Sequence, residues 1–251
     1  VTLMGIVGND ENATLLESLL AEENINSALI KQSSQPTIAK LRVISRHQQV
    51  VRLDFEQTFA PEHAQTLMKS FKACVADYDF IVFSDYNKGS LHYVAEMIQA
   101  ARKLGKKVLV DPKSKDLSIY SGANVITPNK KEFLSAGGEV GSEQSIAASS
   151  RQIMQDCEID SILLTRSEQG MSAITVTDKV DMPAQELEVA DVTGAGDTVI
   201  ATLVVMMAAG LPLVEAAQIA NLAAGVVVAK FGAATVSPKE LYQVTNAEMF
   251  K

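Results

Sequence analysis

The feature that most constrains the fold of this 251-residue chain is a repeated alternation of short apolar runs with longer helix-like segments. The apolar runs that we expect to form strands are residues 1–7, 28–30, 80–83, 107–110, 125–127 and 162–165. Strands that alternate with helices favour a mainly parallel sheet with helices on both faces. The sequence therefore predicts an α/β fold, and its 47% hydrophobic content can fill a sizeable core.

Residues 37–55 depart from this alternation. The two runs 37–44 and 48–55 have the alternating pattern of β-strands, and a short turn at Ser45–His47 joins them. A hairpin inside an α/β pattern indicates a small separate sheet. We expect this sheet to act as a lid.

Polar and charged residues follow four of the expected strands at the point where each strand ends. These segments are residues 84–89, 111–113, 128–132 and 165–170. The carboxyl ends of parallel strands share one edge of a sheet, and ligands bind in the crevice at that edge. The convergence of the four segments therefore predicts a functional site there.

The segment Asp191-Val-Thr-Gly-Ala-Gly-Asp197 precedes a long apolar run, and no Lys or Arg occurs between Asp191 and Lys230. Small residues at the start of a helix let backbone amides converge on an anion, and the helix dipole adds positive charge there. A carboxylate at that position would repel a phosphate if it served only to bind one. Asp197 is better explained as a base that accepts a proton from a hydroxyl. The competing interpretation is a helix cap without chemistry.

Composition excludes some partners. The net charge of −8 gives no electrostatic reason to bind nucleic acid or an anionic membrane. The longest uncharged run, residues 198–214, is interrupted by Gly210-Leu-Pro212, which indicates buried helices and not a membrane span. The two cysteines, Cys74 and Cys157, lack metal-ligand spacing and suit a reducing cytoplasm.

Two motifs resemble those of the ribokinase-like (PfkB) carbohydrate kinases. Residues 191–197 resemble the C-terminal signature of that family, and Thr127-Pro-Asn129-Lys-Lys-Glu132 resembles its Asn-x-x-Glu motif. The resemblance covers essentially the whole chain and is closest to the heptose 7-phosphate kinase branch. Stretches that carry this closer likeness include residues 40–46, 52–55, 84–89, 165–171 and 224–228.

The resemblance implies ATP-dependent phosphorylation of D-glycero-β-D-manno-heptose 7-phosphate at its anomeric hydroxyl. The product would be the 1,7-bisphosphate, on the route to ADP-heptose for the lipopolysaccharide core. Another ribokinase-like sugar or nucleoside kinase, or a nucleotide-binding module without catalysis, remains an alternative. Family members carry a strand with a sugar-contacting Asp and a Gly-Gly-Ala-x-Asn segment before the point where this chain begins. We therefore expect residues 1–251 to be a kinase domain that is incomplete at its N-terminus, with an adenylyltransferase domain in the full-length parent.

The resemblance also assigns roles to single residues. Asp197 would be the catalytic base, and the amides of Gly194, Ala195 and Gly196 would form the anion hole. Asn129 and Glu132 would organise Mg²⁺ and the ATP phosphates, with Glu132 as the metal ligand. The remaining nucleotide-side residues implied are Thr165, Gly170 and, near the adenine, Asn221. Paired lids would join two copies in a homodimer.

A substrate that already carries a phosphate requires cations. The candidates are Arg42, Arg46, Lys88 and Lys113. On spacing alone, the two arginines are better explained as solvated strand or turn charges.

Two further site residues have purely structural alternatives. Asn129 and Glu132 could simply cap a helix that starts after Pro128. Lys113 could pair with Asp111 on a loop.

Overall fold

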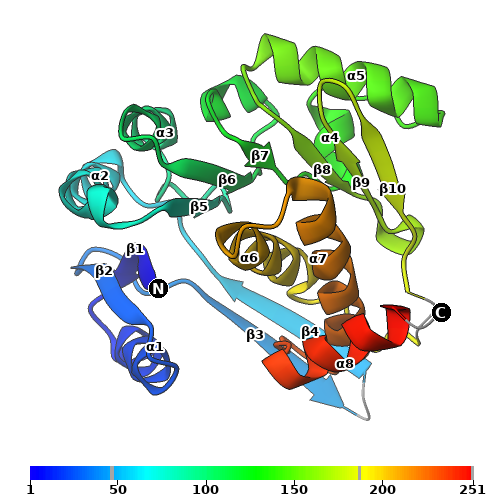
Figure 1. Ribbon diagram of the computed structural model, residues 1–251. Helices are drawn as coiled ribbons and strands as arrows, with labels where there is room; N and C mark the ends of the chain where they lie inside the picture. Colours follow the sequence, from blue (N-terminus) through cyan, green and yellow to red (C-terminus); the bar gives the residue numbers. More distant parts are fainter. Residues whose placement is uncertain (46–47, 186–187, 250–251) are drawn as a thin grey trace. The chain divides into compact units, whose positions relative to one another are not determined.

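The structure, a computed structural model, describes residues 1–45, 48–185 and 188–249. The chain forms two compact units (Figure 1). The first unit comprises residues 1–75 and 87–93, and the second comprises residues 76–86 and the chain from Val94 onward. None of the described helices has the length and apolar character needed to cross a bilayer.

The second unit is built on a six-stranded sheet. Its elements are β5 (Phe80–Ser84), α3 (Val94–Lys103), β6 (Lys107–Asp111), β7 (Val125–Ile126), α4 (Lys130–Ser135), α5 (Glu143–Asp156), β8 (Ile162–Thr165), β9 (Met171–Ile174), β10 (Lys179–Met182), α6 (Ala195–Ala208), α7 (Leu213–Val228) and α8 (Pro238–Met249). The strand order is β10-β9-β8-β7-β6-β5. Strands β5 to β8 are parallel, whereas β9 and β10 are antiparallel to their neighbours.

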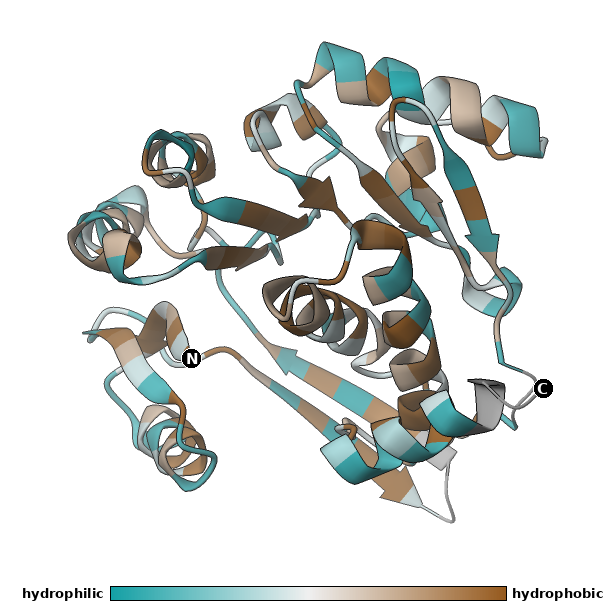
Figure 2. Cartoon of the chain, viewed as in Figure 1, coloured by the Kyte–Doolittle hydropathy of each residue, from teal (hydrophilic) through white to brown (hydrophobic). Residues whose placement is uncertain are grey.

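Helices cover both faces of this sheet. Figure 1 shows α6 and α7 on one face and α3 and α5 on the other. Strands buried on both faces need apolar side chains at every position, and Ile162, Leu163 and Leu164 in β8 are all fully buried. Figure 2 shows the same apolar character along α6 and α7, which pack against the sheet. The predicted α/β architecture is confirmed.

The first unit has its own small core. Its elements are β1 (Thr2–Gly8), α1 (Glu11–Glu22), β2 (Asn26–Gln32), β3 (Ala39–Ser45), β4 (Gln48–Phe55) and α2 (Pro61–Cys74). β1 and β2 form a parallel pair. Ile6, Phe59, Ala64 and Leu67 pack together in its core.

The predicted hairpin is present as the antiparallel pair β3–β4. Its register places the apolar pairs Ala39–Phe55, Leu41–Leu53 and Val43–Val51 on one face, because side chains alternate along a strand. The opposite face carries the pairs Lys40–Asp54 and Arg42–Arg52. The larger side chains of the apolar face are exposed, with Leu41 at 53% and Phe55 at 56%.

The structure differs from the sequence expectation at two helices. α6 begins at Ala195, so residues 195–197 form its first turn and do not precede it. α8 was not expected. Its start carries a recognisable signal, since the Ser237 hydroxyl accepts from the Glu240 amide and the Glu240 carboxylate accepts from the Ser237 amide, as in a capping box.

Candidate functional site

The first turn of α6 places Asp197 at the carboxyl end of the sheet in the second unit. Gly194 is the N-cap residue and has φ of +79°, a left-handed conformation that side-chain-bearing residues rarely adopt. This glycine lets the chain turn sharply into the helix. The Asp197 side chain is exposed in the first helical turn.

The start of α6 offers free backbone donors. The Ala195 amide donates to the Val192 carbonyl, whereas within the described residues the next two amides, of Gly196 and Asp197, donate to no protein acceptor. A Cβ built on Gly194 or Gly196 would meet no atom within 4 Å, so open space adjoins these amides. Unpaired amides at a helix N-terminus form a suitable site for an anion.

Tyr86, which follows β5, reaches the Asp197 carboxylate. Its Oη donates to Asp197 Oδ1 at 2.8 Å. Burial, together with the hydrogen bond to Asp197 and the charge of Asp197, raises the pKa of Tyr86 to about 12. The phenol is therefore protonated, and able to donate, at neutral pH.

Three carboxylates influence one another at this edge of the sheet. Burial, and then the charges of Glu132 and Asp197, raise the pKa of Asp111, the last residue of β6, to about 7, while the charge of Lys113 opposes the shift. Lys113 Nζ contacts Glu132 Oε1 at 2.5 Å. This hydrogen bond is the main cause of a raised Lys113 pKa. The expected alternative, a pairing of Lys113 with Asp111, is therefore not the contact formed.

Asn129 and Glu132 form a complete capping box at the start of α4. The Glu132 amide donates to Asn129 Oδ1, and the Asn129 amide donates to Glu132 Oε2, both at 2.9 Å. Thr165, at the end of β8, lies beside this turn because its amide donates to the Pro128 carbonyl at 3.0 Å. The loops after β7 and β8 are thus adjacent. Asn129 and Glu132 do cap α4, as the structural alternative expected, and this capping is compatible with a role in binding.

Gly170 and Asn221 contact the same short segment, residues 182–184. Gly170 has φ of +81°, and a Cβ there would overlap the Met182 carbonyl oxygen and the Ala184 amide nitrogen. The Asn221 side-chain amide donates to the Pro183 carbonyl at 2.7 Å. Both residues therefore fix the course of the chain after β10, and the buried Asn221 uses its amide nitrogen for that purpose.

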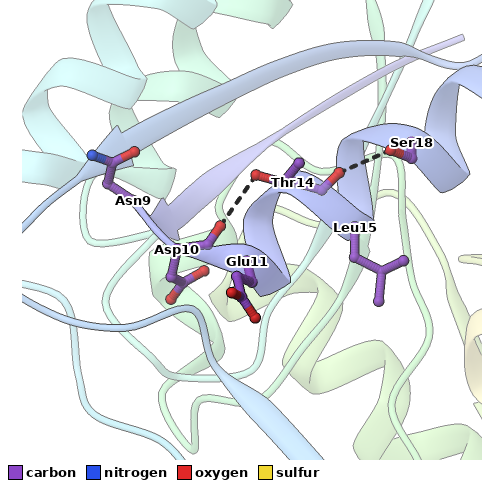
Figure 3. A pocket seen from close by; sticks show the side chains of 6 residues that line it. All are labelled: Asn9, Asp10, Glu11, Thr14, Leu15 and Ser18. Atoms are coloured by element: carbon purple, nitrogen blue, oxygen red, sulfur yellow. Dashed lines mark hydrogen bonds between the residues drawn. The ribbon is translucent and has the colours of Figure 1, made fainter.

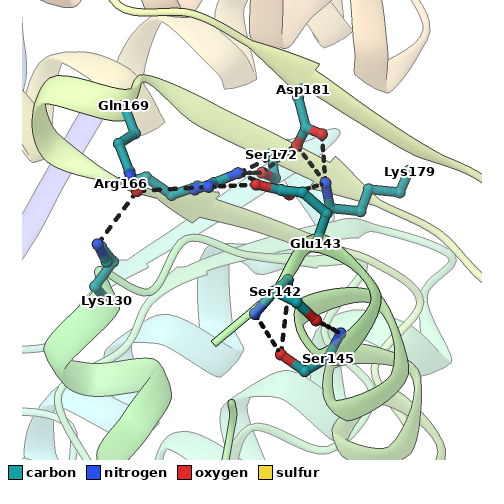
Figure 4. Close-up of polar contacts among 9 residues, drawn as sticks. All are labelled: Lys130, Ser142, Glu143, Ser145, Arg166, Gln169, Ser172, Lys179 and Asp181. Carbon is teal, nitrogen blue, oxygen red and sulfur yellow. Dashed lines mark hydrogen bonds and ion pairs between the residues drawn. The ribbon is translucent and has the colours of Figure 1, made fainter. Parts of the chain in front are cut away.

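An ion network centred on the buried Arg166 side chain holds the loop that follows β8. Arg166 contacts Glu143 at 2.7 Å and Asp181 at 3.4 Å, and Lys179 pairs with the same two carboxylates (Figure 4). Hydrogen bonds from Arg166 and Lys179 lower the pKa of Glu143 to about 2. The network ties β10 and the start of α5 to the loop that leads to Gly170.

The other basic candidates belong to the first unit. Lys88 Nζ pairs with Glu56 Oε1 at 2.6 Å, and Arg42 lies on the charged face of the hairpin. Arg46 lies outside the described residues. A shallow surface depression of this unit is lined by residues at the start of α1 (Figure 3): Asn9, Asp10, Glu11, Thr14, Leu15 and Ser18. Asp10 already accepts hydrogen bonds from Ala13 and Thr37. Its carboxylate therefore has a structural role at the start of α1.

Sequence reasoning missed Tyr86 and Tyr120. Both lie in or near segments that were recognised as polar strand ends, but their partners are distant along the chain: Asp197 for Tyr86 and Asp85 for Tyr120. No spacing rule connects such residues. The only available signal was the position of Tyr86 directly after a strand.

Among the described residues, no group of three or more His, Cys, Asp or Glu side chains is arranged to hold a metal ion by itself. Burial, and then the charges of Glu132 and Asp197, make ionisation of Asp111 unfavourable, and a divalent cation beside these carboxylates would offset that penalty. Mg²⁺ prefers this kind of site, with one or two carboxylates supplemented by water and substrate phosphates.

Comparison with known proteins agrees with this geometry. The profile of the pfkB family carbohydrate kinases matches residues 1–240. The bifunctional protein HldE of Proteus mirabilis is 43% identical over 240 residues, which are 95% of this chain and 51% of that protein. The HldE of Methylococcus capsulatus is 46% identical over 242 residues, or 96% of this chain and 51% of that protein. The chain thus spans about half the length of these curated relatives.

Solved structures share the fold at low sequence identity. Ribokinase from Giardia lamblia superimposes with a TM-score of 0.81 at 16% identity, covering 98% of this chain and 82% of that one. Phosphofructokinase-2 from Escherichia coli, solved in complex with substrates and products, gives a TM-score of 0.80 at 17% identity, covering 98% and 81%.

Proposed function

This chain belongs to the pfkB family of carbohydrate kinases, and we propose on that premise that it phosphorylates D-glycero-β-D-manno-heptose 7-phosphate at the anomeric hydroxyl with ATP. The family membership makes it a phosphotransferase that acts on a sugar. The identity to the HldE proteins supports the choice of a heptose. The observation that carries the mechanism is the Asp197 carboxylate beside unpaired amides at the start of α6.

In the proposed reaction, Asp197 accepts the proton of the anomeric hydroxyl as its oxygen forms a bond to the γ-phosphorus of ATP. The bond from that phosphorus to the β,γ-bridging oxygen breaks, and ADP leaves with the electron pair. The amides of Gly196 and Asp197, with Gly194 and Ala195 shaping the turn, stabilise the charge on the transferred phosphoryl group. Positioning and charge neutralisation are what phosphoryl transfer requires of a protein.

The nucleotide side is assigned to the loops after β7 and β8. Glu132 and Asp111 would hold Mg²⁺, which, when bound, would neutralise charge on the phosphates. Asn129 and Thr165 border this position through the turn that they share. Gly170 and Asn221 act by fixing residues 182–184.

Cations for the sugar phosphate are proposed among Arg42, Arg46, Lys88 and Lys113. Lys113 is held in the second unit by Glu132, and Lys88 in the first unit by Glu56. Each of these lysines would exchange or share its carboxylate partner when a phosphate binds.

Two assembly properties complete the proposal. The relatives are named bifunctional and are about twice as long, which supports a parent protein in which this kinase domain is joined to an adenylyltransferase domain. The exposed apolar face of the hairpin supports a homodimer formed through paired lids, because large apolar patches mark interaction surfaces.

The test uses the full natural protein with ATP, Mg²⁺ and the heptose 7-phosphate, followed by phosphorus NMR of the product. We expect a new phosphate at the anomeric carbon, and we expect Asp197→Asn to lower kcat by at least about 1000-fold while changing the Kd for ATP by less than about three-fold. Asp178→Asn, on an exposed turn, is the matched control. Turnover of another sugar or a nucleoside in its place would reassign the substrate, and ATP binding without turnover of any acceptor would refute catalysis.

A further inference from the structure

A tyrosine occupies one oxygen of the carboxylate to which the proposed function gives the role of base. Tyr86 Oη donates to Asp197 Oδ1 at 2.8 Å, although the two residues are 111 positions apart. We infer that Tyr86 is a positioning residue for Asp197, holding Oδ1 so that Oδ2 faces the acceptor hydroxyl. This inference rests on the proposed function, since it concerns the same site.

An exposed Asp side chain rotates freely between rotamers, and a base is effective only within hydrogen-bond reach of its proton. A hydrogen bond from a neutral donor to a carboxylate is stronger than one between neutral groups. The Tyr86 contact therefore restricts Asp197 to one orientation before substrate arrives, which is where much of the rate advantage of a pre-organised site originates.

Tyr86 is itself held in place through its neighbour, Asp85. The Asp85 amide donates to the Asp111 carbonyl at 3.0 Å, and Asp85 Oδ2 accepts from Tyr120 Oη at 2.5 Å. Tyr120 is fully buried, and its oxygen also accepts from the amides of Lys113 and Ser114 at 3.2 Å. One buried phenol thus joins the loops after β5 and β6 and fixes the backbone from which Tyr86 extends.

The same contact has a competing interpretation. A phenol that donates to the base resembles an acceptor hydroxyl, so Tyr86 could instead occupy the place of the sugar and have to leave before it binds. The two interpretations differ in kinetics. A positioning residue affects kcat, whereas a residue that competes with the sugar affects the KM for the sugar.

The kinetic test compares Tyr86→Phe with wild type in the full natural protein. Tyr86 is 51% exposed, so removal of its hydroxyl leaves packing intact. We expect kcat to fall about ten-fold and the KM values for ATP and sugar to change by less than about two-fold, because the carboxylate loses the donor that fixes its orientation.

Tyr242→Phe is the matched control, because Tyr242 is 68% exposed on α8, and we expect no kinetic change. An unchanged kcat in Tyr86→Phe would overturn the inference. A lower KM for the sugar without a loss of kcat would favour the competing interpretation and would overturn it as well.

A second measurement does not depend on turnover. In protein labelled with carbon-13 at the tyrosine ζ position, the Tyr86 signal is identified by its loss in Tyr86→Phe. We expect this signal to move at neutral pH in Asp197→Asn, where an amide replaces the carboxylate acceptor, and to stay in place in Asp178→Asn. A Tyr86 chemical shift that is unchanged in Asp197→Asn would refute the contact. Absence of kinase activity in the wild type would refute the proposed function alone.

Discussion

Replacing Asp111 by Asn is expected to stabilise the protein, although Asp111 lies in the candidate site. Burial, with the charges of Glu132 and Asp197, raises its pKa from 3.8 to about 7. A carboxyl group with such a pKa is more difficult to ionise in the folded protein than in the unfolded chain. The folded protein therefore loses stability through Asp111 only at a pH where the unfolded chain ionises this carboxyl group.

The size of the effect follows from the two pKa values. Below 3.8, Asp111 is protonated in both states and the folded protein retains its full stability. As pH rises from 3.8 through about 7, the unfolded chain ionises first and the folded state loses stability. The loss amounts to roughly 4 kcal/mol once pH exceeds the folded pKa. An amide at this position carries no charge and avoids the loss.

The assay is urea unfolding followed by circular dichroism, because the chain contains no Trp. The free energy of unfolding of Asp111→Asn should exceed that of wild type by roughly 2–4 kcal/mol near about pH 8.5, and the two should be equal near about pH 4. Asp77→Asn, at an exposed carboxylate, is the control and should show no such trend. Added Mg²⁺ should narrow the difference at the higher pH, since it favours the ionised carboxylate. Equal stability of Asp111→Asn and wild type at both pH values would refute the electrostatic argument.

Two further substitutions test the packing around the nucleotide side. Gly170→Ala should lower the free energy of unfolding by at least about 3 kcal/mol, because a Cβ there overlaps residues 182–184 and the positive φ adds strain. Gly105→Ala, with a positive φ but open space around it, should lower it by about 1 kcal/mol. Equal shifts in Tm for the two variants would contradict this prediction. Arg166→Met should cost roughly 2 kcal/mol in urea unfolding because the nearly buried guanidinium loses its hydrogen bonds to the Glu143 carboxylate and the buried Ser172 hydroxyl. Lys31→Met, in an exposed pair, should cost under about 1 kcal/mol. A cost for Arg166→Met as small as that for Lys31→Met would show that the ion network contributes little.

The sequence predicted the sheet well because each strand has a local signature. The first three residues of β8 are apolar and buried, as a strand covered on both faces requires, and the hairpin alternates as a one-faced sheet does. The sequence pattern places residues 195–197 before the helix, although they form the first turn of α6, since a glycine-rich segment gives no helical periodicity. α8 was missed although Ser237 and Glu240 provide a capping signal at its start.

The candidate site could be predicted only as far as strand ends and short motifs allow. Asp197 and the Asn129–Glu132 pair were found because each lies within one local motif. The Tyr86 contact and the raised pKa of Asp111 depend on side chains from different strands, whose distances are set by tertiary packing. A pairing of Lys113 with Asp111, two residues away, was the structural alternative, whereas Lys113 pairs with Glu132 across two loops.

The double engagement of Glu132 has an evolutionary consequence. The residue both completes the capping box of α4 and pairs with Lys113, so selection for folding alone would preserve it. Asp197 is exposed, and α6 would keep its turn without that carboxylate. In a related protein that had lost kinase activity, we expect Asp197 to be substituted first. Asn129 and Glu132 would be retained because they stabilise the start of α4.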